Sequence, residues 1–591
     1  MNKTVLTSFT TLCLLSTVFL IGYKLSVKAS PEGIHVPDNY EKIQWAIGNA
    51  TDGDTIFVHN GTYYERVVID KSLSLIGEDR HSTIIDGEGT GSVISVKANN
   101  VDIDGFTIQN SGSNISDSGI YVISSGNNIS HNTITNNKNG IYLYYSNNNT
   151  VSDNNVYSNY WYGIYLYYSS SNVISDNNVY SNYNDGIYLY YSNNNTVSDN
   201  NVYSNNNGIY LYYSSSNVIS NNNATNNDCG IWIRQLSSSN VISGNNLSSN
   251  KNGIYLYYSN NNVISSNDAY SNKDYGIYLQ YSSSNIISNN NAHSNNWYGI
   301  NLYYSSNNNT IHHNNFINNT DQVWSDSVNV WNDNNEGNYW SDYAGQDLNG
   351  NGIGDTPYII DVNNQDNHPL MGTFSNFTVT WKGENYHVTT ICNSTISNFR
   401  FEIGPETGNK IIRFNAAGKD NTVGFCRVMT PTDLTNYPFI VLVDEEEITP
   451  TSLDVSDSTH VYLYFTYAHS SHTITLISSK LLHLYNELLD KYAKLQIDFY
   501  SLNSTYHELL NNQSTLLGNY SQLLERYSIL NASYQEWLLN YSELQANYTS
   551  LLLEHTQNIR SIIYVFIATT TIFIIAVAYL STHAHRKGSR S

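Results

Sequence analysis

A Gly-Ile dipeptide, usually followed by an aromatic residue, returns every 21 to 23 residues through the middle of the chain and constrains its fold more than any other feature. Such a regular step is typical of a solenoid, in which each repeat forms one coil stacked on the last. Within a repeat the apolar residues alternate with period two, among many Asn, Ser and Gly residues. The pattern therefore predicts a parallel β-helix and not a helical solenoid. The dipeptide begins at Gly119, Gly140, Gly163, Gly186, Gly208, Gly230, Gly253, Gly276 and Gly299.

A pair of Asn residues is the second repeated feature, and it would lie at the same tight turn of successive coils. Asn tolerates left-handed backbone, and its amide can hydrogen-bond along a stack. We interpret the pairs as a structural ladder without chemistry. Asp153, Asp176 and Asp199 each precede such a pair, so we assign them to the turn as well. The pairs are Asn154-Asn155, Asn177-Asn178, Asn200-Asn201, Asn222-Asn223, Asn245-Asn246, Asn290-Asn291 and Asn314-Asn315.

The block begins with a segment that predicts a cap. Residues 33–89 contain a short amphipathic pattern around 40–49, and we expect this helix to cover the open end of the solenoid, where unpaired strands would invite aggregation. The series "GDTIFV…GTYYE…LSLIGE…TIIDG" and the Gly-Ile-Tyr coils resemble the NosD-type right-handed parallel β-helix, within a broader group of carbohydrate-binding proteins and sugar hydrolases. The resemblance implies a right-handed β-helix over residues 30–372.

The end of this region, "GNYWSDYAGQDLNGNGIGDTPYIIDVNNQDNHPLM", also resembles NosD-type domains and contains an EF-hand-like loop. Oxygen ligands at alternating positions can wrap one hard cation, and Gly352 permits the sharp turn. Position twelve is Tyr358 instead of a bidentate Glu, so the site would be incomplete or would use Asp361. The pattern favours structural Ca²⁺ over an Asx-rich turn without metal. The expected ligands are Asp347, Asn349, Asn351, Ile353 and Asp355.

Stacking in register would align aromatic side chains in columns on the outer face of the solenoid. Aromatic faces with phenol hydroxyls suit a long neutral glycan or a partner protein. The alternative, compatible with the first, is that the rings only reinforce packing between coils. The candidate ligand-binding residues are Tyr142, Tyr165, Tyr188, Tyr210, Trp232, Arg234, Tyr255 and Tyr278. A second column is expected at Tyr144, Tyr167, Tyr190, Tyr212, Tyr257 and Tyr303.

The residues favour binding to surface polysaccharide or to neighbouring envelope proteins, without catalysis. Glycoside hydrolysis needs two positioned carboxylates, and the region from His81 to Phe399 contains a single Arg, Arg234. There, in "NDCGIWIRQL", Asp228 and Arg234 could form a site. A carbohydrate-active lyase, hydrolase or epimerase is the alternative, on fold analogy.

Nucleic acid and copper are two further ligands that the sequence bears on. The formal net charge of −23 argues against nucleic acid, whose phosphates need clustered Lys and Arg. Copper handling, which the NosD resemblance implies, is a third reading that the residues support poorly, because copper favours Met, Cys and His. The His residues are scattered, and adjacent strand residues would point to opposite faces. They are His131, His293, His312 and His313.

Both ends of the chain carry membrane signals. Residues 1–29 read as a signal peptide, with an uncleaved anchor as the alternative. Residues 561–580 have about the 20 apolar residues that span a bilayer, and the basic segment 581–591 would stay in the cytoplasm. We therefore expect a single-pass cell-membrane protein whose main body is extracellular. Many Asn-x-Ser/Thr sequons support glycosylation only weakly.

Two further segments connect the solenoid to the anchor. Residues 373–478 contain alternating runs separated by turns, which predict a small antiparallel β-sandwich that Cys392 and Cys426 could staple. Residues 479–558 carry a heptad of Leu and Tyr, which predicts a coiled-coil stalk and a homo-oligomer. The alternative is a helix that folds back on the chain. The first seam position is Leu481, Leu488, Leu495, Leu502, Leu509, Leu516, Leu523, Leu530, Trp537, Leu544 and Leu551.

Overall fold

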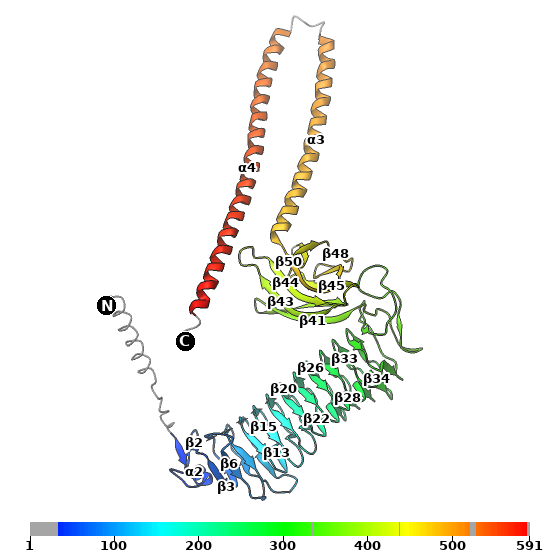
Figure 1. Cartoon of the computed structure of the whole chain (residues 1–591). Helices are drawn as coiled ribbons and strands as arrows, with labels where there is room; N and C mark the ends of the chain where they lie inside the picture. Colours follow the sequence, from blue (N-terminus) through cyan, green and yellow to red (C-terminus); the bar gives the residue numbers. More distant parts are fainter. Residues whose placement is uncertain (1–32, 334, 436–437, 521–526, 588–591) are drawn as a thin grey trace, which may run out of the picture. The chain divides into compact units, whose positions relative to one another are not determined.

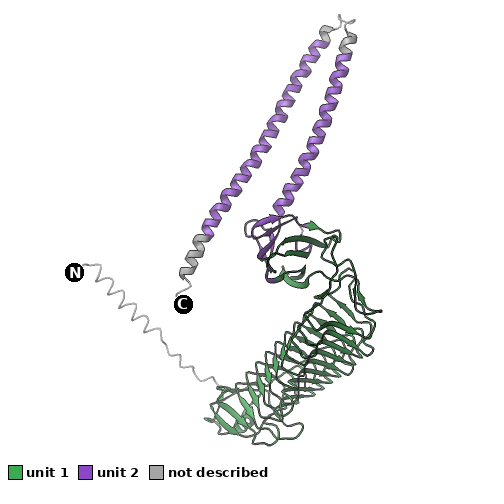
Figure 2. Cartoon of the chain, turned by 45° about the vertical axis from the view of Figure 1, so that its right-hand side comes forward, with its two compact units in different colours: residues 1–395, 417–430, 451–470 green, residues 396–416, 431–450, 471–591 purple. Residues whose placement is uncertain are grey.

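The computed structural model describes residues 33–333, 335–435, 438–520 and 527–587 of this protein. The signal peptide expected at residues 1–29 lies outside the described residues. The chain forms two compact units, one of residues 1–395, 417–430 and 451–470 and one of residues 396–416, 431–450 and 471–591 (Figure 2). The first unit contains a right-handed solenoid of stacked parallel strands (Figure 1). The predicted parallel β-helix is confirmed.

Each coil of the solenoid contributes one short strand to each of three parallel sheets. Sheet I runs from β1 (Ile34–Val36) through β2 (Thr55–Val58) to β35 (Thr310–His312), and sheet II runs from β3 (Gly61–Tyr64) to β38 (Tyr339–Trp340). Sheet III runs from β4 (Val67–Ile69) to β37 (Asp321–Ser325) and has 12 strands where the others have 13. One full coil consists of β13 (Asn139–Tyr144), β14 (Thr150–Ser152) and β15 (Asn155–Tyr157).

The inside of the solenoid is a column of aliphatic side chains. In one coil Ile141, Leu143, Val151 and Val156 are fully buried, because the alternation turns every second residue inward. Burying each such side chain contributes about 1.5–3 kcal/mol. The expected cap helix is α2 (Ile43–Asn49), which lies against β1, β2 and β4 and buries its apolar side. The periodicity therefore predicted both the core and its cap.

A buried Asn ladder runs along each of the three corners of the coil. At the corner between sheets I and II, Nδ2 of Asn177 donates to the carbonyl oxygens of Val151 (2.8 Å) and Ser175 (2.9 Å) and to Oδ1 of Asn200 (3.0 Å). The structural role predicted for the Asn pairs is confirmed, and the other two corners have ladders of their own. The corner between sheets III and I has Asn127, Asn149, Asn172, Asn195, Asn217, Asn240, Asn262, Asn285, Asn309 and Asn329. The corner between sheets II and III has Asn137, Asn159, Asn182, Asn205, Asn227, Asn250, Asn272, Asn295 and Asn319.

Two five-stranded antiparallel sheets follow the solenoid and form the small sandwich that the sequence predicts. Their strand orders are β41-β42-β45-β49-β48 and β43-β44-β50-β46-β47. Cys392 and Cys426 stand directly opposite each other on β42 (Glu384–Cys392) and β45 (Val423–Pro431), but both are free thiols. The remaining strands are β41 (Thr373–Trp381), β43 (Thr395–Ile403), β44 (Lys410–Ala417), β46 (Phe439–Val443), β47 (Glu446–Ile448), β48 (Thr451–Ser452), β49 (His460–Ala468) and β50 (Ser471–Ser478).

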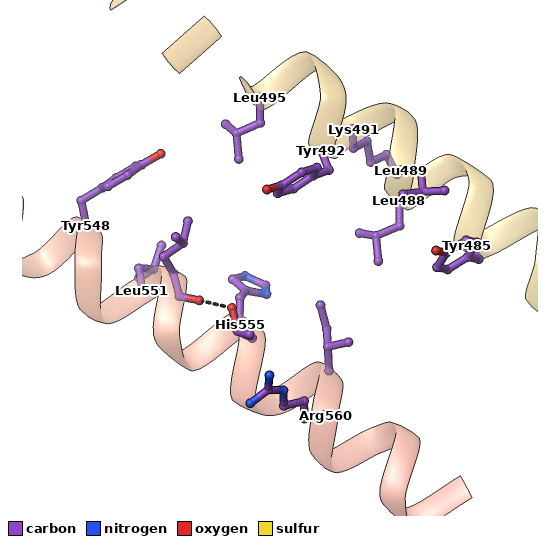
Figure 3. A pocket seen from close by; sticks show the side chains of 13 residues that line it. Tyr485, Leu488, Leu489, Lys491, Tyr492, Leu495, Tyr548, Leu551, His555 and Arg560 are labelled. Carbon is purple, nitrogen blue, oxygen red and sulfur yellow. Dashed lines mark hydrogen bonds between the residues drawn. The ribbon is translucent and has the colours of Figure 1, made fainter. Parts of the chain in front are cut away.

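Two long helices, α3 (Lys480–Tyr520) and α4 (Tyr527–Lys587), end the described chain. They run side by side, and Tyr506 stacks on Tyr541 with ring centroids 5.9 Å apart. Figure 3 shows seam side chains of both helices facing an apolar cleft of about 810 Å³. Within α4, the stretch Leu530–Val577 includes a segment long and apolar enough to cross a membrane. The described chain thus has two helices that lie against each other and not one long helix, and the coiled coil stays a prediction.

Candidate functional site

Sheet III carries the predicted aromatic column on its outer face. The strand register places Tyr142, Tyr165 and Tyr188 side by side, and it continues through Tyr210, Trp232, Tyr255 and Tyr278. Neighbouring rings stack: the centroids of Tyr142 and Tyr165 are 4.6 Å apart at an interplanar angle of 13°. A regular parallel register makes this stacking unavoidable, because residues one coil apart share one position.

The exposure of this first column differs from our expectation. Tyr142, Tyr188 and Tyr210 are only 7–8% exposed, although they point away from the aliphatic core. The cause is the second column, whose rings lie against them edge-on; the Tyr142 and Tyr144 centroids are 5.8 Å apart at 75°. Burial raises the pKa of Tyr142 well above its usual value, so this phenol stays neutral.

A third aromatic column, which the alternation rule missed, is more exposed. Its members are the second Tyr of the Tyr-Tyr pairs, together with Tyr281, which follows Gln280; Tyr145 and Tyr168 are 55% and 38% exposed. Their centroids are 5.1 Å apart at 8°. Both have a positive φ, 50° and 48°, so the corner directs them outward instead of inward. The repeated Tyr-Tyr dipeptide is the sequence feature from which this column could have been predicted. The column is Tyr145, Tyr168, Tyr191, Tyr213, Tyr258, Tyr281 and Tyr304.

Arg234 replaces a ring in the second column. It ends β25 (Cys229–Arg234), and its guanidinium carbon lies 5.8 Å from the Tyr212 ring centroid and 5.4 Å from that of Tyr257. The guanidinium is also 5.1 Å from the Trp232 ring. Such cation–π contacts favour a fixed cation on an aromatic surface. The arrangement puts a single positive charge at the middle of the face, among aromatic side chains of which Asp228 is not a part.

A polar pocket lies elsewhere, at the corner between sheets I and II. It has a volume of about 390 Å³ and is lined by Arg80, His131, Asp153 and Asp176, with three Asn side chains. Nδ1 of His131 is 2.8 Å from the Asp104 carboxylate, and Nη1 of Arg80 donates to the carbonyl of Asp153 at 3.4 Å. The two Asp residues have a positive φ of 58°, which agrees with their assignment to the turn. The repeat pattern did not predict this pocket, because Arg80 comes from an earlier coil that lacks the regular repeat.

The expected calcium loop is an ordered turn. The Asp347 carboxylate accepts hydrogen bonds from the backbone N–H groups of Gly350 (2.8 Å), Asn351 (3.0 Å) and Gly352 (2.7 Å). The Asp355 carboxylate accepts from the N–H of Leu348 (2.6 Å) and from Nδ2 of Asn349 (3.2 Å). The carboxylates of Asp347 and Asp355 therefore both accept hydrogen bonds within one compact loop. Gly352, at φ 83°, lies in the sharp turn of this loop.

Comparison with known proteins relates the solenoid to two family models. One, described as "Right handed beta helix region", matches residues 92–247, and one, described as "Periplasmic copper-binding protein (NosD)", matches residues 204–345. A cell surface glycoprotein of Methanothermus fervidus is 37% identical over 103 residues, which cover 17% of this chain and 17% of that protein. The match thus spans about a sixth of that relative.

Solved structures with similarity to this chain include two carbohydrate-active enzymes. The A-module of mannuronan C-5 epimerase AlgE6 from Azotobacter vinelandii is 16% identical, with a TM-score of 0.43, and covers 49% of this chain and 92% of that chain. The catalytic domain of a GH87 α-1,3-glucanase is 13% identical, with a TM-score of 0.40, and covers 52% of this chain and 69% of that chain.

The copper named by the second family model does not fit the residues of the matched region. His312 and His313 do approach each other, with their Nδ1 atoms 3.1 Å apart. Our expectation of opposite faces was wrong here, because His313 has a φ of 58° and leaves the strand. Burial lowers the pKa of His312 to about 4. Glu336 contacts the other nitrogen of His313, Nε2, at 2.9 Å, so among the described residues the three do not present their ligand atoms to one point.

Proposed function

We propose that this protein, whose solenoid matches models of right-handed β-helix and NosD-type families, is a membrane-anchored cell-surface protein whose β-helix binds a polysaccharide without catalysis. The apolar stretch of α4 supports the anchor, and the similarity to a cell surface glycoprotein supports the location. In this topology the basic end of the chain is cytoplasmic and the solenoid is extracellular.

The aromatic face of sheet III is the observation that carries this proposal. Three parallel columns of rings cover one side of the solenoid, and the outermost offers exposed or half-exposed Tyr rings and phenol hydroxyls on seven of its coils. Sugar rings stack on such faces, while hydroxyls hydrogen-bond to phenols. Arg234 adds one cation at which an acidic group or a hydroxyl of the glycan would be held. A surface of this extent with no ligand is unusual for a soluble domain.

A matched pair of variants tests the proposal. The full-length protein in detergent is applied to a glycan array, together with the triple variant Tyr145→Ser, Tyr168→Ser, Tyr191→Ser. The control replaces Tyr157, Tyr180 and Tyr203, which form a similar stack on sheet II, by Ser. We expect the first variant to lose glycan binding about tenfold or more and the control to keep it. Equal effects of the two variants, or binding only to envelope proteins, would contradict the proposal.

A carbohydrate-active enzyme is the second candidate, and the polar pocket supports it. Asp153 and Asp176 come from neighbouring coils about 4.8 Å apart, beside an imidazole and a guanidinium. A lyase, hydrolase or epimerase needs such acid–base groups next to its substrate. Release of unsaturated or reducing ends from a bound glycan, lost in Asp153→Asn, would establish catalysis and overturn the binding-only reading.

We also propose that the loop of residues 347–355 holds a structural Ca²⁺. The support is the donor set, in which side-chain oxygens of Asp347, Asn349, Asn351 and Asp355 and the carbonyl of Ile353 alternate along the loop. Such an ion would tie the end of the solenoid without taking part in glycan binding.

A further inference from the structure

The N-terminal cap brings two His residues and one Asp to a single point. His35 lies on β1, Asp38 follows it in the next turn, and His59 comes directly after β2. Nδ1 of His35 is 3.4 Å from Nε2 of His59, which is 3.5 Å from Oδ2 of Asp38. All three atoms lie within 4.8 Å of one another, and no other such group of His, Cys, Asp or Glu occurs among the described residues. The cluster is independent of the aromatic face.

The His35–His59 spacing is that of a long hydrogen bond and also that of two ligands of one tetrahedral metal ion. A zinc ion with ligands at about 2.0–2.1 Å has tetrahedral ligand atoms about 3.3–3.4 Å apart, by simple geometry. Good hydrogen bonds between nitrogen and oxygen are shorter, about 2.7–3.2 Å. The separations of 3.4 and 3.5 Å are close to this ligand spacing, and the third pair of atoms lies within 4.8 Å.

Neighbouring side chains hold the two His rings of the cluster in position. Nδ1 of His59 is 3.4 Å from the carboxylate of Glu78, which also accepts a hydrogen bond from the N–H of Asn60 at 2.9 Å. A carboxylate behind a ligating imidazole fixes its tautomer and raises its basicity. The His35 ring stacks between Phe57 and His59, with both centroid distances 5.5 Å. The site is thus preorganised on two paired strands.

We propose that His35, Asp38 and His59 bind a divalent transition-metal ion, best matched by Zn²⁺, with a water in the fourth position. Two imidazoles and one carboxylate without sulfur suit Zn²⁺, whereas Ca²⁺ and Mg²⁺ prefer oxygen alone and Cu(I) prefers sulfur. The side chains of His59 and Asp38 are 40% and 69% exposed, so solvent reaches the site. The three residues precede both regions matched by the family models. The ion would link β1 to the end of β2 and strengthen the cap.

Metal content and thermal unfolding test the site. Full-length protein in detergent, freed of metal and kept in excess Ca²⁺, is loaded with Zn²⁺, desalted and analysed by mass spectrometry. We expect one Zn²⁺ per chain and a melting temperature that rises with Zn²⁺. His59→Gln should abolish both effects, and Glu78→Gln should weaken binding about 10-fold or more. The control His131→Gln removes a different His–Asp pair and should change neither.

An unchanged metal-free melting temperature shows that His59→Gln folds. Zinc content that is equal in the wild type and in His59→Gln, or binding of Cu²⁺ but not of Zn²⁺, would overturn the proposal.

Discussion

The corner Asn residues use nearly all of their hydrogen-bonding capacity inside the solenoid. Asn200 illustrates this, because its Nδ2 donates to Ile174 O (2.8 Å), Ser198 O (2.9 Å) and Asn222 Oδ1 (2.9 Å). Its Oδ1 accepts from the backbone and the amide of Asn177. No other side chain of this size offers donors and an acceptor in the same plane. The repetition of Asn therefore follows from the need to satisfy buried backbone groups at every corner.

Asn200→Ala should destabilise the solenoid far more than Asn201→Ala. The first variant leaves buried carbonyl and N–H groups without partners, and each costs about 1–3 kcal/mol. Asn201 lies outside the corner, where its Nδ2 donates to Oδ1 of Asn178 at 2.9 Å, so its loss should cost about 1 kcal/mol. Urea unfolding followed by circular dichroism measures both. Equal losses would show that the buried ladder is not the stabilising element.

Asp185→Asn should stabilise the protein at neutral pH. Burial raises the pKa of Asp185 from 3.8 to about 6. The hydrogen bond that Nδ2 of Asn207 donates at 2.7 Å lowers this pKa but does not offset the burial. The folded state thus binds the proton more tightly than the unfolded state, and stability falls as pH rises from about 4 to about 6. Raising this pKa from 3.8 to about 6 corresponds to a loss of about 3 kcal/mol in the free energy of unfolding at neutral pH.

Asn is also the residue at this position in other coils, at Asn139, Asn207 and Asn252. Melting temperatures of the wild type and the variant should therefore converge near pH 4 and diverge above pH 6. A constant difference across this range would disprove the assignment of the pKa.

At the level of the element, the strands were predictable and the corners were not. Period-two alternation placed Ile141 and Leu143 inside and Tyr142 and Tyr144 outside, as the structure has them. It failed at Tyr145, because a left-handed residue interrupts the alternation. The cap metal cluster was missed for a related reason: His59 lies one position beyond its strand, and only the pairing of β1 with β2 brings it to His35.

Ca²⁺ should stabilise the solenoid end through the loop of residues 347–355. Binding would add about 2.7 kcal/mol at a Ca²⁺ concentration of about 100 Kd. The melting temperature of metal-free protein should therefore rise on addition of Ca²⁺, with Zn²⁺ absent. Asp355→Asn should remove this rise. Asp342→Asn, a nearby acid that accepts a hydrogen bond from Tyr358, should keep it. No rise in the wild type would show that the loop is a turn without metal.

At the scale of the whole molecule, the helical segment leaves much apolar surface exposed. Leu502 and Leu509 are 70% and 62% exposed on α3 even with α4 beside it. We propose that copies of the chain associate through these seam residues, since exposed rows of Leu rarely stay unpartnered.

Light scattering in detergent should therefore show an oligomer. The double variant Leu502→Glu, Leu509→Glu should reduce it to a monomer, because charges would enter the apolar seam. Ile497→Glu, at an equally exposed position of 67% off the seam, is the control and should leave the mass unchanged. A monomeric wild-type chain would exclude association through the stalk.

The sequence by itself determined the β-helix, its core and its Asn corners, because a stacked coil gives every repeat the same environment and so selects the same residues. It also determined the apolar segment of α4 that could span a membrane, because that property depends only on length and hydropathy. Tertiary structure decided which Tyr rings are exposed, that Arg80 joins Asp153, and that His35, Asp38 and His59 converge. These features depend on left-handed corners and on residues from irregular coils. Their positions follow from the packed backbone and not from the repeat.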